Sequence, residues 1–229
     1  THKNDYIYIN ESKSATELKE NGITLNLKLK DNLVSYILDF INNKEFQFNR
    51  NQKKLIKFSD RNKYNDLYIL NYMNPHLDNE VISNILHNEK LIYTIKNYLK
   101  VEPILEWSQI YWSLPFKDKK GETLIPPNNE YGYHYDIDGF KFLKVFFYLT
   151  DVTSYSGPHV FIEKSGDKTL YKALNRRIDE EEVKKKFGEK KLIITGKKGT
   201  GFIEDTSFYH KGTSPNYERG VLSCLYNIS

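Results

Sequence analysis

The fold of this chain centres on the stretch Tyr131-Gly132-Tyr133-His134-Tyr135-Asp136-Ile137-Asp138-Gly139. In an extended strand, successive side chains point to opposite faces, so His134 and Asp136 share one face. An imidazole and a carboxylate side by side supply two adjacent positions of a metal's coordination sphere. The stretch therefore predicts part of a metal site at the end of a strand.

A third ligand is proposed far downstream, at His210 in the segment Phe208-Tyr209-His210-Lys211-Gly212-Thr213. Two histidines and one carboxylate that leave coordination positions open form the facial triad of non-haem Fe(II) oxygenases. A His-x-Asp pattern arises readily by chance, so its surroundings matter. An aromatic and branched run of strand type, residues 140–151, follows it, and then a Gly157-Pro158 turn.

The order of these motifs resembles the phytanoyl-CoA dioxygenase-like (PhyH) family of Fe(II)/2-oxoglutarate-dependent oxygenases. The likeness covers roughly residues 104–226, and it rests on His134-x-Asp136, Phe142–Asp151, Gly157–Ile162, His210 and Arg219. One departure is visible, because the family usually reads Gly-Ser-His after the Gly-Pro strand. This chain has Lys164-Ser165-Gly166-Asp167 there.

The element pattern, with helices first and many short strands afterwards, predicts an α+β fold. The resemblance implies a double-stranded β-helix, a cupin-like jelly roll, with helices packed on one sheet. We expect one domain over residues 1–229. Residues 1–103 form its mainly helical part with edge strands, and residues 104–229 form its β-helix core with a helical insertion around 167–188.

Local signals place several elements in the N-terminal part. Ser14 to Glu17 has capping-box spacing and predicts a helix that ends at Asn21-Gly22, and Asp31 is predicted to cap a second helix. Apolar spacing predicts two further helices, about 78–87 and 89–99. Residues 46–72 contain strand-like pieces among polar connections; the sequence assigns them no function, and a lid over the active-site mouth is one alternative. The loop 115–129 is expected to close over a substrate.

Arg219 opens the last apolar strand, nine residues after His210. A buried guanidinium binds a carboxylate through two parallel charge-assisted hydrogen bonds, so Arg219 is the candidate partner for the C5 carboxylate of 2-oxoglutarate. Thr213 resembles a hydroxyl that the family carries just after its distal histidine. The weaker pocket candidates are Tyr111, Gln109 and Lys144, and Trp107, Gln109, Tyr111 and Ser113 share a polar-aromatic strand face.

The resemblance implies that Fe(II) is held by His134, Asp136 and His210, with 2-oxoglutarate and O2 at the remaining positions. Oxidative decarboxylation to succinate and CO2 would then drive hydroxylation of a small-molecule substrate. Halogenating relatives have glycine or alanine at the position of Asp136, so the carboxylate points to hydroxylation or to a related desaturation or ring closure. His159 follows the Gly-Pro turn and is expected to contact a ligand or the substrate, while His2, His76 and His87 are expected to be structural.

Composition narrows the alternatives. The net charge is +4 and the lysines occur in short clusters, which indicates a solvated surface rather than a nucleic-acid interface. The chain has a single cysteine, Cys224, which fits a reducing compartment. The sequence also shows no signal peptide and no apolar run long enough to span a bilayer. Together these features predict a cytoplasmic protein without a membrane partner. The oligomeric state is left open.

Two other functions stay open at this point. One is a sugar-binding β-helix module with a vestigial triad, against which the intact His134, Asp136, His210 and Arg219 argue. The other is nucleic-acid dealkylation by a related oxygenase. That activity would require a second arginine in the last strand, and no arginine follows Arg219.

Overall fold

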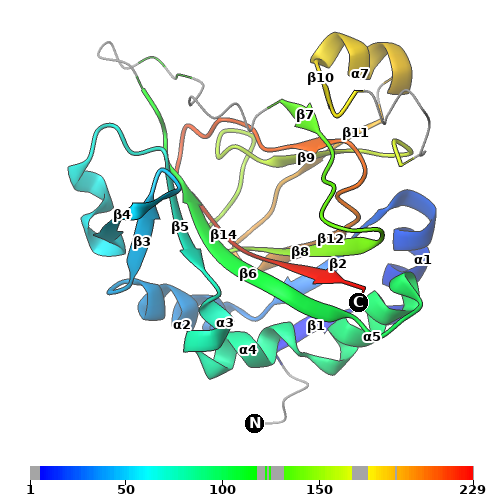
Figure 1. Ribbon diagram of the computed structural model, residues 1–229, viewed down its shortest axis with the longest axis horizontal. Coiled ribbons are helices and arrows are strands. Elements are labelled where there is room, and N and C mark those ends of the chain that lie inside the picture. The colour runs from blue at the N-terminus through cyan, green and yellow to red at the C-terminus, as the bar shows by residue number, and fades with distance from the viewer. Residues whose placement is uncertain are drawn as a thin grey trace.

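A computed structural model describes residues 6–117, 122, 124, 132–166, 175–188 and 190–228. Two antiparallel β-sheets face each other, and helices cover the outer face of the larger one (Figure 1). The mixed α+β class predicted from the element pattern is confirmed. None of the helices in these described ranges is long and apolar enough to cross a membrane.

The larger sheet has nine strands, and its middle comes from the C-terminal half of the chain. In spatial order the strands are β1 (Ile7–Ile9), β2 (Ile23–Leu29), β12 (Thr200–Glu204), β8 (Phe142–Tyr148), β14 (Arg219–Asn227), β6 (Ile104–Ser113), β5 (Ile69–Met73), β3 (Glu45–Phe48) and β4 (Asn51–Lys57). The N-terminal part therefore supplies both edges of this sheet. These strands correspond to the edge strands expected from the sequence.

The smaller sheet has five strands, in the order β10 (Arg177–Ile178), β7 (Tyr133–His134), β13 (His210–Lys211), β9 (His159–Ile162) and β11 (Lys191–Ile194). The predicted insertion 167–188 is partly described. Residues 167–174 lie outside the described ranges, β10 joins the sheet beside β7, and α7 (Glu180–Phe187) follows with Asp179 capping its N-terminus. Most of the predicted loop 115–129 also lies outside the described residues.

The helices are α1 (Glu11–Asn21), α2 (Asp31–Ile41), α3 (Pro75–Asp78), α4 (Glu80–Leu86) and α5 (Glu89–Leu99). Apolar side chains such as Ile37, Ile85 and Leu91 share one core with Val145 and Leu222 of the larger sheet. This confirms the prediction of helices packed on one sheet. Two predicted caps were wrong: Asn10, not Ser14, accepts the capping hydrogen bond of α1, and Asp31 is the first residue of α2 instead of its cap.

A second core fills the space between the two sheets. Phe146, Phe202 and Val221 of the larger sheet meet Phe161 and Ile194 of the smaller one. Strand alternation explains this separation, since Phe146 faces the interior while its neighbours Val145 and Phe147 face the helices. The result is an apolar layer between the two sheets.

The strand-like pieces expected within residues 46–72 are strands in the structure. The segment forms β3, β4, the 3-10 helix η2 (Phe58–Lys63) and the start of β5, which extend the larger sheet beyond β6. Their apolar side chains Phe46, Phe58 and Leu70 belong to the helix-side core. Burial of these side chains explains why the segment continues the sheet.

Candidate metal centre

Three predicted ligands converge on the smaller sheet. His210 of β13 lies directly opposite His134 of β7, and Asp136 follows β7 with its backbone N–H bonded to Thr206 O at 2.7 Å. One ligand atom from each of these residues lies within 4.8 Å of the others. His134 Nε2 is 4.0 Å from Asp136 Oδ1, and His210 Nε2 is 3.6 Å from Asp136 Oδ2.

Backbone hydrogen bonds orient both imidazoles. His134 Nδ1 donates to Gly132 O at 2.9 Å, and His210 Nδ1 donates to Phe208 O at 2.9 Å. A carbonyl oxygen only accepts, so each Nδ1 carries the proton and each Nε2 keeps its lone pair in the neutral ring. The same arrangement orients metal-ligating histidines in general.

The electrostatics suit a cation at this position. Burial raises the pKa of the Asp136 carboxyl, but the neighbouring His210 and Lys144 outweigh this effect and hold the pKa well below its usual range. Burial lowers the pKa of His210 to about 4, so at neutral pH this ring is uncharged and Lys144 is the cation that keeps Asp136 ionised. The Nε2 atoms of the two imidazoles and an ionised carboxylate fit the facial ligand set of a divalent iron.

Lys144 lies at the metal centre. Its ammonium is 2.7 Å from Asp136 Oδ2 and 2.7 Å from Asp138 Oδ2, and it stands 5.4 Å from the centre of the Trp107 ring. On β14 its cross-strand neighbour is Leu225, six residues from Arg219. Six strand residues span ~20 Å, so the structure does not bring Lys144 to Arg219.

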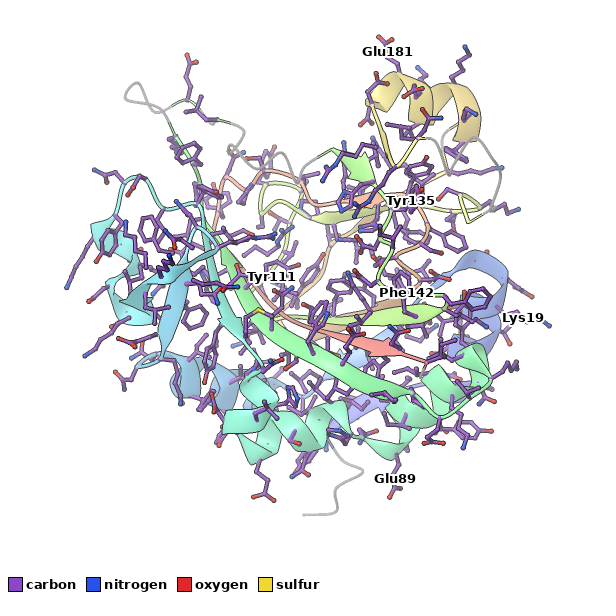
Figure 2. All side chains as sticks on the ribbon, viewed as in Figure 1. Lys19, Glu89, Tyr111, Tyr135, Phe142 and Glu181 are labelled. Atoms are coloured by element: carbon purple, nitrogen blue, oxygen red, sulfur yellow. The ribbon has the colours of Figure 1, made fainter. Side chains whose placement is uncertain are left out.

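Arg219 forms a second polar region at the start of β14. It is 4% exposed, and its Nη2 donates to Ser113 Oγ at 3.4 Å. Its guanidinium carbon is 5.9 Å from the centre of the Tyr111 ring. Arg219 Nε is buried and has no hydrogen-bond partner among the described residues. Figure 2 shows Tyr111 on β6, across the interior from Tyr135 next to β7.

The remaining predicted pocket residues have protein partners. Gln109 Oε1 accepts from Asn71 Nδ2 at 3.0 Å, on the β6 face that also carries Tyr111. The Thr213 hydroxyl donates to Pro158 O at 2.8 Å. That bond holds the segment after β13 against the Gly157-Pro158 turn, where an added Cβ on Gly157 would lie 2.4 Å from Thr213 O.

Sequence reasoning missed one charged residue in the interior. Glu204 of β12 is fully buried, its carboxylate oxygens lack hydrogen-bond partners among the described residues, and burial raises its pKa to about 7. His159 Nε2 is 2.9 Å from Glu204 Oε2, although the angles are not those of a hydrogen bond. The His159 ring stacks on His210 with centroids 5.5 Å apart, so His159 lies beside the triad as predicted. Because Phe202 and Glu204 are two residues apart on one strand, they share a face, and this spacing could have placed Glu204 in the interior.

The departure from the family pattern has a local structural explanation. Ser165 Oγ donates to Ile162 O at 2.7 Å and accepts from Tyr209 N at 2.8 Å, immediately before His210. An added Cβ on Gly166 would lie 2.2 Å from the Phe208 ring. This turn therefore packs against the segment that carries the distal histidine.

No protein-family model matches the sequence, and a comparison with curated protein sequences found no match. The fold is similar to several solved structures. SnoN, described as a non-haem alpha-ketoglutarate-dependent epimerase from nogalamycin biosynthesis, has 11% identity and a TM-score of 0.63 over 94% of this chain and 81% of its own. EctD from S. alaskensis with bound Fe has 16% identity and a TM-score of 0.64 over 95% and 76%.

A third structure extends the similarity over nearly the whole of both chains. AviO1 from Streptomyces viridochromogenes Tue57 has 11% identity and a TM-score of 0.60, with 96% of each chain covered. At these identities the similarity establishes a shared fold.

Proposed function

We propose that the protein is an Fe(II)- and 2-oxoglutarate-dependent oxygenase that hydroxylates a small molecule. One observation carries this proposal: the same interior holds a triad suited to a divalent metal and, at its other end, a buried arginine without an ion-pair partner among the described residues. A buried charge is costly unless it is paired. An anionic cosubstrate that spans the two ends would supply the partner.

In this proposal His134, Asp136 and His210 hold Fe(II). The bound metal supplies O2 activation coupled to decarboxylation of 2-oxoglutarate, which releases succinate and CO2. Arg219 receives the C5 carboxylate in a bidentate pair, a geometry that an ammonium cannot reproduce. The Tyr111 ring and the Ser113 hydroxyl hold the guanidinium in place.

The apolar walls of the interior support the same assignment. Phe146, Phe202 and Val221 belong to the apolar cluster between the two sheets, and this cluster lines the region that the triad and Arg219 also face. Exclusion of water strengthens the electrostatic interactions in the site and suppresses side reactions. Orientation and desolvation are therefore the tasks of the protein, while the metal and 2-oxoglutarate supply the redox chemistry.

The comparisons support the class. Solved neighbours include EctD with 2-oxoglutarate and 5-hydroxyectoine, and SnoN with Fe3+, alpha ketoglutarate and nogalamycin RO. Because SnoN is an epimerase, the outcome at the substrate carbon varies within this fold. The carboxylate at Asp136 argues against halogenation, and among the remaining outcomes, which include desaturation and ring closure, we propose hydroxylation.

Several finer assignments belong to the same proposal. The two sheets would be the two sides of a double-stranded β-helix, and the sequence motifs favour the phytanoyl-CoA dioxygenase-like group within this fold. We further propose that residues 1–229 act as one domain, that the protein works in the cytoplasm on a small molecule, and that neither nucleic acid nor membrane is a partner.

The test is succinate release from 2-oxoglutarate by the Fe(II)-loaded protein across a panel of metabolites, lipids, amino acids and sugars. We expect turnover that depends on Fe(II) and O2, with a product that is heavier by one oxygen atom. Binding of a sugar without any succinate release, in protein that retains Fe(II), would instead favour the non-catalytic binding module.

A further inference from the structure

The most unusual feature of the metal centre is a lysine bound to one of its ligands. Lys144 Nζ bridges Asp136 Oδ2 and Asp138 Oδ2, at 2.7 Å from each. The side chain of Lys144 is 13% exposed and that of Asp136 is 15% exposed, so water screens this pair weakly. A full positive charge therefore lies next to the carboxylate that would face a divalent cation.

The position of Asp138 is fixed by the end of β14. Asp138 O accepts a hydrogen bond from Asn227 Nδ2 at 2.9 Å. The next residue, Gly139, lies so close to the Asn227 amide that an added Cβ would be 2.5 Å from its oxygen. The Asp138 side chain is 37% exposed and lies on the solvent side of the bridge. Lys144 thus has a second carboxylate held within its reach.

We propose that Lys144 and Asp138 together set the divalent-metal affinity of the triad, with Lys144 lowering it and Asp138 raising it. This inference rests on the proposed function, because it takes the triad to be the metal site. Lys144 competes with a metal for the charge of Asp136 and repels a dication. Asp138 offsets both effects, because it supplies a negative charge and draws the ammonium away from Asp136.

The test is a titration of chelator-treated protein with Co(II), a stable probe for the Fe(II) site, at a pH where both aspartates and Lys144 are charged. Lys144→Met should bind Co(II) roughly tenfold more tightly, since one neighbouring charge commonly changes a proton affinity by 1–3 pKa units. Lys144→Arg keeps the charge and should stay within about threefold of wild type. Lys141→Met is the matched control, because Lys141 Nζ donates to Tyr98 O on α5.

Asp138→Asn tests the opposite effect, because it removes the negative charge that is proposed to raise metal affinity. The side chain is partly exposed, so this variant should fold normally. We expect it to weaken Co(II) binding several-fold, and to weaken it less in the Lys144→Met background, since coupled residues are not additive. Unchanged or weaker binding by folded Lys144→Met would overturn the proposal. Equal or tighter binding by Asp138→Asn would also overturn it, even if Lys144→Met did not fold.

These outcomes are separate from failure of the metal site itself. If wild type bound no Co(II), or if His210→Ala bound it equally well, the triad would not be the metal centre. If wild type and His210→Ala differed as expected while Lys144→Met matched wild type, only the role of Lys144 would be refuted.

Discussion

Lys144 and Arg219 are two buried cations that face the same interior from neighbouring strands, β8 and β14, but their surroundings differ. Lys144 lies within 2.7 Å of two carboxylates. Arg219 has a 3.4 Å hydrogen bond to Ser113, and its Nε has no partner in the described part of the chain. The comparison teaches that two carboxylates of the protein balance the charge at the metal end, whereas the described residues supply no anion at the arginine end, where our proposal assigns the cosubstrate.

The largest expected effect concerns the ligands at the metal end. His134→Ala, Asp136→Ala and His210→Ala should each abolish succinate release, because two remaining groups do not complete the facial set. Activity assays and circular dichroism of each variant would check this. Full activity in any one variant would remove that residue from the ligand set, and loss of the folded spectrum would indicate a structural role instead.

The two cations should also differ in their contribution to stability. In chelator-treated protein without 2-oxoglutarate, Lys144→Met leaves a buried carboxylate without its cation and should lower the free energy of unfolding by about 3 kcal/mol. Arg219→Met breaks no ion pair and should cost about 1 kcal/mol or less. Urea unfolding of both variants would measure this difference, and the reverse order would contradict the contrast between the two ends.

Glu204 gives a smaller, pH-dependent effect that sharpens the account of the metal end. Its folded pKa of about 7 lies above the ordinary value of 4.5, so its contribution to stability is present below pH 4.5 and is lost as the pH rises towards 7. The amide in Glu204→Gln does not ionise, so the variant does not lose stability in this way as the pH rises. The variant should therefore gain stability relative to wild type between pH 4.5 and 7, by up to about 3 kcal/mol, with little further change above.

Chelator-treated protein is the sample for that comparison, unfolded with urea at several pH values. The lowered pKa of His210 gives wild-type stability the opposite slope, rising with pH between about 4 and 6.5. Glu204→Gln retains His210, so this contribution largely cancels in the difference. A stability difference that does not change with pH would show that Glu204 is ionised throughout and is paired with another group.

The structure brings together the three residues that the sequence suggested as ligands. His134 and Asp136 follow from local strand alternation, whereas His210 lies far downstream and was found through the order of motifs in the family resemblance. The contacts of Lys144 did not follow, because they depend on the register between β8 and β14 and on the path of the chain after β7. Strand alternation alone places the Lys144 side chain on the interior face, but it does not show which carboxylates the ammonium contacts.

The errors and gaps in the predicted fold have similar causes. Ser14 has capping-box spacing, yet α1 begins one turn earlier because Asn10 caps it and Ser14 is buried. The sequence left the role of residues 46–72 open because most of the segment is polar, but a few apolar side chains such as Phe46 and Phe58 pack into the helix-side core. In both cases tertiary packing outweighed a local signal.

The most direct test of the central claim is an anaerobic titration of the Fe(II)-loaded protein with 2-oxoglutarate. Removing one partner of a buried charge pair costs ~2–5 kcal/mol, so Arg219→Met should bind 2-oxoglutarate about 30-fold more weakly or worse, with iron binding little changed. Arg219→Lys should be intermediate. Arg61→Met is the control, because Arg61 pairs with Glu218 at 3.1 Å outside the interior. Equal affinity in wild type and Arg219→Met would contradict the account.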